Sequence, residues 1–317
     1  MSMNENKVVM GGTGIMGASL CQVYALAGYE TWGYDAFEAG IENGKHLIAL
    51  NQETMVKEGL ITQEESDAAV ARIHFTQDKS VFEDCCLVVE STVERMDIKQ
   101  GFFAEVSEIA PKEALLATNT SGLHITEIAE ACKYPERFMG QHWLNPPHLL
   151  PLCEIIAGAK TSEENVKKMR KLVEGLGKQP VVVADINGFI INRIQFALLR
   201  EALHIVEVGA ATYEDVDTVL KAGMGLRYAV LGPFGVADHG GIHTFDHITS
   251  YLNADLADDK VESPVLKKMV EEGKLGVKSG QGFYDYSGDK ADQAIKERDR
   301  MYIELAKILY FGKHAER

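Results

Sequence analysis

Residues 7–22, KVVMGGTGIMGASLCQ, determine how the first half of this chain folds. A short apolar run leads directly into three glycines, and an apolar helical pattern follows. In such a G-x-G-x-x-G arrangement the glycines allow a tight turn, a close approach of the backbone to a pyrophosphate, and close packing of the helix. The N-terminus of the helix then faces the anion. The stretch predicts a strand, a dinucleotide-binding loop and a helix, with ligand contacts from Gly12, Gly14, Ile15, Met16 and Gly17.

An acidic residue at the end of the next predicted strand, residues 30–35, indicates which dinucleotide binds. Asp35 lies eighteen residues after Gly17. A carboxylate there accepts hydrogen bonds from the adenine-ribose hydroxyls and repels a 2′-phosphate. A glycine-rich turn without a ligand is the alternative interpretation, but the strand and the acid favour a cofactor site. The pattern predicts NAD rather than NADP.

The predicted secondary structure changes character near the middle of the chain. Through the first half, strand-like segments alternate with helical patterns, which is typical of a parallel sheet covered by helices. Two charged amphipathic helices form an excursion at about 37–73. After Asn187 the strand patterns stop and long helical periodicity begins. We predict an α/β, Rossmann-type NAD-binding domain over 1–187 and an all-α C-terminal domain over 188–317. The other expected strands are 86–91, 114–119, 137–143 and 180–185.

Composition excludes several classes of partner. The net charge of -15 disfavours nucleic acid, whose binding requires many lysines and arginines to neutralise phosphates. No apolar run is long enough to predict a membrane span or a signal segment, and the five cysteines show no metal spacing. We therefore expect a cytoplasmic protein that binds a small molecule. His239, His243 and His247 are spaced like metal ligands, but adjacent glycines weaken a helix there, and no metal site is predicted.

A second stretch, residues 140–156, GQHWLNPPHLLPLCEII, places His142 and Glu154 in an apolar, proline-broken segment. A buried charge is costly unless it has a partner. Oxidation of a secondary alcohol needs a base that takes the hydroxyl proton while hydride leaves, and imidazole titrates in the right range. A neighbouring carboxylate fixes the tautomer of the imidazole and stabilises its charged form. The pair is predicted to be catalytic; a hydrogen-bonded core histidine and a glutamate at a strand end are the alternative.

Hydrogen-bond donors for the reacting oxygen are expected at two further places. Asn119 and Ser121 follow a predicted strand at the edge where open α/β sheets bind ligands. Asn192 begins the helical half of the chain. Donors such as Ser121 and Asn192 stabilise the developing carbonyl oxygen. Alternatively, Ser121 caps a helix that starts near Ile125, and Asn192 is a hydrogen-bonding residue at a helix start.

The order of these segments resembles the L-3-hydroxyacyl-CoA dehydrogenase family. The similarity extends from the glycine loop to Tyr286 and includes NTS, HWLNP, CEII, GFIINR and the late stretch LGVKSGQGFYDYS. It implies an NAD-binding domain and a helical C-terminal domain that usually dimerises, and hence a homodimer.

The resemblance also implies roles for individual residues. By position, His142 corresponds to the catalytic base and Glu154 to its carboxylate partner. Ser121 and Asn192 match residues that hold the reacting oxygen of the substrate. Glu94 and Lys99 match positions that line the nicotinamide side of the cofactor. Asn119, at the end of its strand, is also predicted to bind the cofactor.

Some positions depart from the family pattern. The excursion is where CoA-using members hold the nucleotide tail, yet Thr54 and Glu58 stand where short-chain members carry lysine. Lys45 and Lys57 are possible replacements. Residues 223–234, GMGLRYAVLGPF, resemble the branch with L-gulonate 3-dehydrogenase, lambda-crystallin and L-carnitine dehydrogenase, which acts without CoA. Arg227 then becomes a candidate for binding a substrate carboxylate; a solvated surface arginine is the alternative.

The motifs and the resemblance together give three candidate functions, in order of preference. The first is reversible NAD-dependent oxidation of a short L-3-hydroxyacyl-CoA, such as 3-hydroxybutyryl-CoA. The second is oxidation of a small 3-hydroxy acid without CoA. The third is a non-catalytic NAD-binding or structural protein. The tail after Tyr286 predicts one more amphipathic helix, packed on the C-terminal domain or on a partner subunit.

Overall fold

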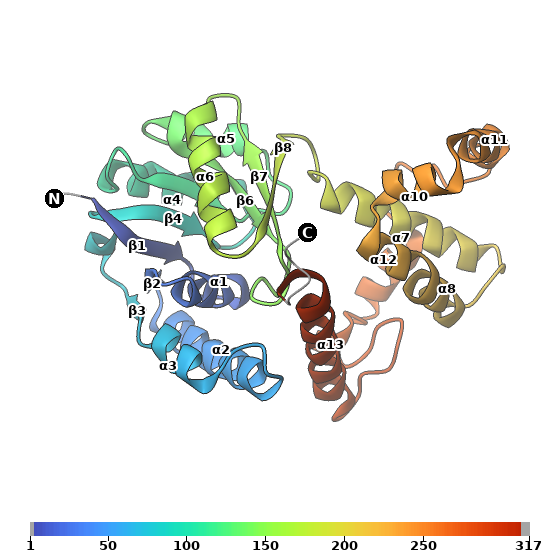
Figure 1. Cartoon of the computed structure of the whole chain (residues 1–317), viewed down its shortest axis with the longest axis horizontal. Coiled ribbons are helices and arrows are strands. Elements are labelled where there is room, and N and C mark those ends of the chain that lie inside the picture. Colours follow the sequence, from blue (N-terminus) through green and yellow to red (C-terminus); the bar gives the residue numbers. More distant parts are fainter. Residues whose placement is uncertain (1–2, 312–317) are drawn as a thin grey trace. The chain divides into compact units, whose positions relative to one another are not determined.

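The computed structural model describes residues 3–311, which form two compact units (Figure 1). The first unit comprises the chain up to Ile190 together with the segment from Asp299 onward, and the second unit is Ile191–Arg298. This division lies close to the predicted boundary near Asn187. The prediction placed 299–317 in the helical domain, whereas the contacts assign the segment from Asp299 to the first unit.

Residues 3–311 contain one eight-stranded sheet, in the order β3-β2-β1-β4-β5-β6-β7-β8. Neighbouring strands are parallel except β6 and β7, which are antiparallel. The predicted α/β architecture is therefore confirmed. Two strands were not among the expected ranges: β3, a short half-buried edge strand with a weak apolar pattern, and β7. The strands are β1 (Asn4–Gly11), β2 (Glu30–Tyr34), β3 (Ile73–Thr76), β4 (Cys85–Glu90), β5 (Leu115–Thr118), β6 (Phe138–Trp143), β7 (Leu152–Ala157) and β8 (Gln179–Ala184).

Helices cover both faces of this sheet. Side chains alternate along a strand, so Val9 of β1 lies in one hydrophobic core while Val8 and Met10 lie in the other. The first core is closed by α4 and α5, and the second by α1 and α6. The helices of the first unit are α1 (Ile15–Leu26), α2 (Glu38–Lys57), α3 (Gln63–Val70), α4 (Met96–Ile109), α5 (Ile125–Ala129) and α6 (Glu163–Gly175), with short turns η1 (Lys79–Phe82) and η2 (Pro135–Arg137).

The predicted helical excursion is present as α2 and α3, between β2 and β3. The start of α3 is defined by a capping box, in which the side chain of Thr62 accepts from the amide of Glu65 and the side chain of Glu65 accepts from the amide of Thr62. In α2 the buried residues lie on one face, including Ile41, Ile48 and Met55, as the amphipathic pattern predicts.

The second unit is helical, as predicted. Its elements are α7 (Ile191–Glu207), α8 (Tyr213–Val219), the π-helical turn η3 (Leu220–Gly225), α9 (Leu226–Val230), α10 (Pro233–Gly240), α11 (Ile242–Leu252), α12 (Pro264–Glu271), the turn η4 (Val277–Ser279) and the first half of α13 (Lys290–Ala306). Gly241, with φ of 88°, separates α10 from α11. The three histidines spaced four apart therefore do not share one helix.

The second half of α13 and the turn η5 (Lys307–Phe311) pack against the first unit. Ile303 is fully buried in a small core with Met55 of α2 and Leu149 of the β6–β7 connection. The predicted extra helix exists, but the structure buries it against residues that the sequence did not suggest as its partners.

The strand order places a topological switch between β1 and β4. From β1 the chain continues outward through β2 and β3, and from β4 it continues in the other direction. In open α/β sheets ligands bind at this point, outside the carboxyl ends of the strands. Two loops meet there: the glycine loop after β1 and residues 91–95 after β4.

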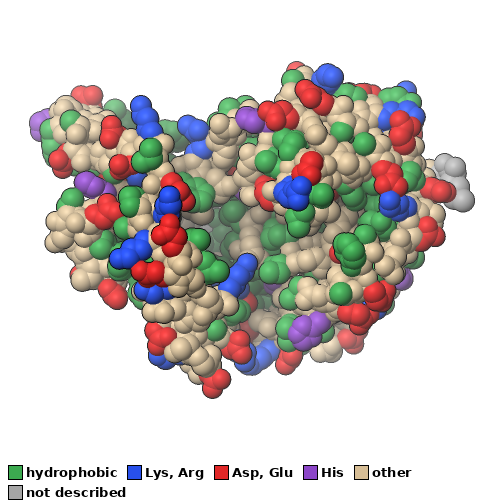
Figure 2. Space-filling view, turned by 180° about the vertical axis from the view of Figure 1, so that it is seen from behind, with side chains coloured by type: hydrophobic (Ala, Val, Ile, Leu, Met, Phe, Trp, Pro, Cys, Tyr) green, Lys and Arg blue, Asp and Glu red, His purple; other side chains and the backbone are tan. Residues whose placement is uncertain are grey.

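The surface agrees with the acidic composition. On the face in Figure 2, lysine and arginine side chains are interspersed with acidic ones rather than gathered into one basic area. Among residues 3–311, no helix combines the length and the apolar character that crossing a bilayer requires.

Candidate functional site

The glycine loop has the shape that a dinucleotide requires. Gly12 has φ of +99°, a conformation that side chains disfavour, and a Cβ there would lie 2.9 Å from the carbonyl oxygen of Ser91. A Cβ on Gly17 would lie 1.9 Å from the oxygen of Gly12, so only glycine permits this contact between loop and helix. Around Gly14 no atom lies within 4 Å of such a Cβ. The loop is thus tight on its inner side and open at Gly14.

The start of α1 supplies free amide groups at that opening. Gly14 is the N-cap of α1, and no side chain caps the helix or places an acid in its first turn. Uncapped amides and the positive end of the helix dipole favour an anion such as a pyrophosphate. Ile15 and Met16, predicted to contact the cofactor, form this first turn.

Asp35 is held in place beside the glycine loop. One carboxylate oxygen accepts from the amide of Thr13 at 3.0 Å and from its hydroxyl at 2.9 Å. The other accepts from the amide of Phe37 at 3.0 Å. The first oxygen thus has both of its acceptor positions occupied, and the second retains one for a ribose hydroxyl. Loop, helix start and acid together fit NAD, and the adenosine and pyrophosphate parts would be held by these residues.

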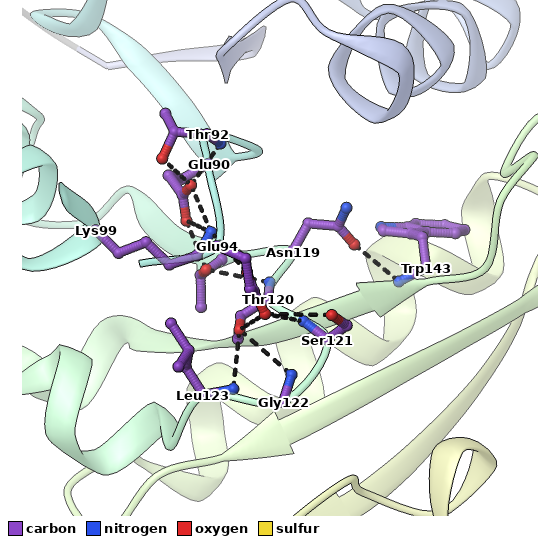
Figure 3. Close-up of polar contacts among 11 residues, drawn as sticks. Glu90, Thr92, Glu94, Lys99, Asn119, Thr120, Ser121, Gly122, Leu123 and Trp143 are labelled. Atoms are coloured by element: carbon purple, nitrogen blue, oxygen red, sulfur yellow. Dashed lines mark hydrogen bonds and ion pairs between the residues drawn. The ribbon is translucent and has the colours of Figure 1, made fainter. Parts of the chain in front are cut away.

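The carboxyl end of β4 carries a buried network that sequence analysis only partly identified (Figure 3). Glu90, with no exposed surface, accepts from the ammonium group of Lys99 at 2.8 and 3.0 Å. It also accepts from the amide and the hydroxyl of Thr92, both at 2.6 Å, and from the hydroxyl of Thr118 at 2.6 Å. Glu90 was not predicted, although its position at the end of an apolar strand, like that of Asn119, was the available signal.

Glu94 connects this network to the loop after β5. Lys99 lies 3.4 Å from Glu94, whose Oε1 accepts from the hydroxyl of Thr120 at 2.6 Å and from the amide of Ser121 at 2.8 Å. Burial by itself raises the pKa of this carboxyl, but the hydrogen bond from Thr120 and the charge of Lys99 outweigh it and lower the pKa of Glu94. Glu94 is therefore an anion that fixes the loop of residues 119–123.

Asn119 and Ser121, both predicted site residues, lie in this loop. Asn119 donates its amide to the carbonyl of Glu90, and its side-chain oxygen accepts from the amide of Trp143 at 2.9 Å. The Ser121 hydroxyl lies 3.2 Å from Glu94 (Figure 3). The alternative role for Ser121, as a helix cap, is not what the structure shows, because His124 is the N-cap of α5.

The cap of α5 comes instead from Asp185, which sequence analysis missed. Its carboxylate accepts from the amides of Ile125 and Thr126, at 3.1 and 2.8 Å, and from the Thr126 hydroxyl at 2.6 Å. Despite partial burial, these bonds and the nearby His124 lower the pKa of Asp185. Only the separation of sixty residues between Ile125 and Asp185 hid this partner from a local pattern.

His142 and Glu154 form the buried pair that their apolar setting predicted. The antiparallel pairing of β6 and β7 places them directly opposite each other. Nδ1 of His142 lies 2.8 Å from Oε2 of Glu154, and the two side chains are 5% and 2% exposed. Oε1 of Glu154 accepts from the amide of Ile190 at 2.9 Å. The ring of Phe189 lies 5.5 Å from the imidazole, centroid to centroid. The carboxylate thus holds the imidazole by Nδ1, which leaves Nε2 for chemistry.

The remaining predicted substrate residues lie elsewhere. Asn192 is in the first turn of α7 and Arg227 is in α9, both in the second unit, and their substrate roles stay predictions. Lys45 pairs with Glu42 at 2.7 Å on the exposed face of α2. Lys57 is the last residue of α2 and is exposed.

Two alternative chemistries find no support in residues 3–311. No group of three or more His, Cys, Asp or Glu side chains is arranged there to hold a metal ion. Cys153, beside Glu154, is fully buried, and burial together with the neighbouring carboxylate raises the pKa of its thiol. A neutral buried thiol is a poor nucleophile.

Comparison with known proteins assigns the chain to a class. A family model described as "3-hydroxyacyl-CoA dehydrogenase, NAD binding domain" matches residues 7–186, and one described as "3-hydroxyacyl-CoA dehydrogenase, C-terminal domain" matches residues 188–286. The chain therefore belongs to the 3-hydroxyacyl-CoA dehydrogenase family. It is an NAD-dependent oxidoreductase that acts on a CH–OH group.

The individual relatives are named for two different activities. A probable 3-hydroxybutyryl-CoA dehydrogenase of Deinococcus radiodurans is 39% identical over 276 residues, 87% of this chain and 98% of the relative. The 5-formyl-3-hydroxy-2-methylpyridine 4-carboxylate 5-dehydrogenase of Mesorhizobium japonicum is 33% identical over 300 residues, 94% of this chain and 96% of the relative.

Solved structures repeat this division. One is the structure of a 5-formyl-3-hydroxy-2-methylpyridine 4-carboxylic acid 5-dehydrogenase, an NAD-dependent dismutase. It matches with a TM-score of 0.90 at 32% identity, over 96% of this chain and 99% of the dismutase chain. An (S)-3-hydroxybutyryl-CoA dehydrogenase of Ralstonia eutropha matches with a TM-score of 0.74 at 29% identity, over 90% of this chain and 100% of the Ralstonia chain.

Proposed function

We propose that His142 is the base that takes the hydroxyl proton of the substrate. The observation that carries this proposal is the buried contact of 2.8 Å between its Nδ1 and Glu154. A carboxylate at Nδ1 keeps the proton there, so that Nε2 presents a lone pair to the substrate hydroxyl. As Nε2 takes that proton, the imidazole becomes charged and Glu154 stabilises the charge. NAD, when bound, accepts the hydride from the carbon that bears this hydroxyl.

The other polar residues have supporting roles in this proposal. Ser121 and Asn192 donate hydrogen bonds to the oxygen as it becomes a carbonyl. Glu94 and Lys99 border the nicotinamide, and Asn119 keeps the loop after β5 against β6 through its bond to the amide of Trp143. The glycine loop and Asp35 hold the remainder of the cofactor.

The first candidate substrate is a short L-3-hydroxyacyl-CoA, oxidised reversibly to the 3-oxo compound. It is supported by relatives named 3-hydroxybutyryl-CoA dehydrogenase, at 35 to 39% identity over about nine-tenths of the chain. Lys45 and Lys57, on the exposed face and at the end of α2, would bind the CoA phosphates.

The second candidate is a small hydroxy acid without CoA. It is supported by the TM-score of 0.90 to a dehydrogenase of a pyridine carboxylic acid, and by the larger share of the chain that this relative covers. On α2, the ammonium of Lys45 already pairs with Glu42, and the position of Glu58 adds an acid rather than a base. In this case Arg227 would bind the substrate carboxylate.

The decisive experiment compares NADH consumption with acetoacetyl-CoA and with free acetoacetate at equal concentrations. Turnover of the thioester alone supports the first candidate. Turnover of the free acid, or of neither compound while NADH binds, supports the second and directs the search to other carboxylate-bearing hydroxy acids. A His142→Asn variant serves as control: if it retained full turnover, the proposed base would be wrong.

We also propose that the second unit mediates a homodimer. Its surface exposes large apolar side chains that a monomer would leave in water, including Leu226, Val230 and Phe234, which are 69%, 72% and 86% exposed. Such patches are typical of protein–protein contacts. Sedimentation of the wild type and of Phe234→Glu tests this: a dimer that the substitution dissociates is expected, and a monomeric wild type would contradict it.

A further inference from the structure

The loop between the two catalytic strands determines how His142 meets Glu154. His142 is the second-last residue of β6 and Glu154 the third of β7, so residues 144–151 connect them closely. Three of these eight residues are prolines, which donate no backbone hydrogen bond. The loop therefore needs partners outside itself to keep one conformation, because its carbonyl groups are not satisfied by regular pairing.

Lys178 provides those partners. It directly precedes β8, which is parallel to β7, and it is 7% exposed. Its ammonium group donates to three carbonyls of the loop: Pro147 at 2.7 Å, Leu150 at 3.1 Å and His148 at 3.5 Å. The adjacent amide of Gln179 donates to Pro151 at 2.8 Å. A lysine has three donors, and all three are used on one loop.

The C-terminal segment covers this lysine. The ring of Phe311 lies 5.6 Å from its ammonium group, within the range of a cation–π contact. Both residues line a cavity of about 390 Å³ beside the ends of α1 and α6. Next to it, Ile303 packs on Leu149 of the same loop, and Lys307 donates to the carbonyl of Glu58. A buried ammonium is costly without such partners, so its presence here points to a specific role.

We propose that Lys178 is a positioning residue for the reaction: it ties the loop 144–151 to β8, under the cover of Phe311, and thereby fixes the contact between His142 and Glu154. The inference rests on the proposed function of that pair. It adds a residue that touches neither substrate nor cofactor, and a C-terminal segment that lies beyond the part of the chain matched by the family models.

The charge of Lys178 gives the proposal a signature in pH. Burial lowers the pKa of Lys178 to about 8, against a smaller opposite effect of Cys153. Among residues 3–311, the titratable side chains recorded around it are Cys153 of β7 and His148 of the loop. Burial also raises the pKa of the Cys153 thiol, so that this thiol stays neutral there. Above pH 8 the amine has one donor fewer, and one loop carbonyl loses its partner.

The test measures kcat as a function of pH for the wild type, Lys178→Met and Lys178→Arg. A displaced catalytic pair costs up to about 100-fold in rate. We expect kcat of the wild type to fall above pH 8, where Lys178 loses its charge. Lys178→Met should lose about 10- to 100-fold in kcat, with little change in the KM for NADH, and should lack this fall. Lys178→Arg keeps a charge and donors, so it should restore part of kcat and move the fall to higher pH. Lys79→Met, on an exposed ion pair with Glu105, is the matched control.

Phe311→Ala keeps the lysine and removes only its cover, so it provides a second variant if Lys178→Met does not fold. We expect kcat to fall less than in Lys178→Met, and the fall above pH 8 to shift toward the ordinary range of lysine. Unchanged kcat and pH profiles in both variants would overturn the inference while leaving His142 as the base. Loss of the proposed function itself would appear differently, as full turnover by a His142 variant.

Discussion

Replacement of Glu154 by glutamine is the sharpest single test of the site, because the two side chains have nearly the same shape. Both oxygens of Glu154 accept hydrogen bonds: Oε2 faces Nδ1 of His142 at 2.8 Å, and Oε1 faces the amide of Ile190 at 2.9 Å. Glutamine has one oxygen and one NH₂ group. In either orientation, one of the two donors faces another donor.

The size of the loss in kcat depends on which of the two donors the NH₂ group of glutamine faces. If the NH₂ group faces Ile190, His142 keeps an acceptor but loses the charge of its partner. A hydrogen bond to a charged group contributes about 1.5–3 kcal/mol, which corresponds to a loss of roughly 10- to 150-fold in kcat. If the NH₂ group faces His142, the imidazole proton moves to Nε2, no lone pair is left for the substrate, and the loss approaches about 10⁴-fold.

The assay is the steady-state reduction of NAD with the 3-hydroxy form of whichever compound the wild type turns over, because His142 takes the proton in this direction. NADH binding is followed by fluorescence. We expect kcat to fall by at least about tenfold while NADH affinity stays within about twofold, since Glu154 lies on β7 and the cofactor loops follow β1, β4 and β5. Glu163→Gln, on the exposed start of α6, is the matched control. A Glu154→Gln enzyme with the kcat of the wild type would refute the pairing argument.

Three further outcomes are expected. Asp35→Ala should lower the preference for NAD over NADP by roughly 10- to 100-fold in kcat/KM, because a charged acceptor is lost and a repulsion is removed; equal preference in both proteins would contradict this role. Glu90→Gln should lower Tm by several degrees and weaken NADH binding, since Lys99 loses a buried partner, and an unchanged melting curve would argue against the network. The pKa of Glu94 is lowered from its ordinary value of 4.5, so the folded state binds fewer protons than the unfolded state around that value. The free energy of unfolding of the wild type should therefore decline relative to Glu94→Gln as the pH falls below 4.5, whereas a constant difference would show that Glu94 is not ionised in a stabilising network.

The features that sequence analysis predicted are those encoded by neighbouring residues. The glycine loop, Asp35 and the helices of the excursion each follow from a pattern within about twenty residues, and each is present. The pairing of His142 with Glu154 was predicted because a buried acid in an apolar strand requires a partner, and the structure places the two opposite each other across β6 and β7.

The features that were missed depend on contacts distant in sequence. Glu90 looks like an ordinary strand end until Thr118 of the neighbouring strand β5 is seen beside it. Asp185 caps a helix sixty residues earlier, and Lys178 binds a loop about thirty residues earlier. In each case the partner is determined by the strand order of the sheet, which local periodicity does not specify.

The first unit is discontinuous along the chain, and this has a consequence for its biosynthesis. The sheet, both catalytic strands and Lys178 are synthesised first, but Ile303 and Phe311, which cover the β6–β7 loop, emerge after the entire second unit. Domains generally fold as they leave the ribosome. The nascent first unit must therefore exist for some time with Leu149 uncovered, and it receives this packing partner only after the second unit has been synthesised.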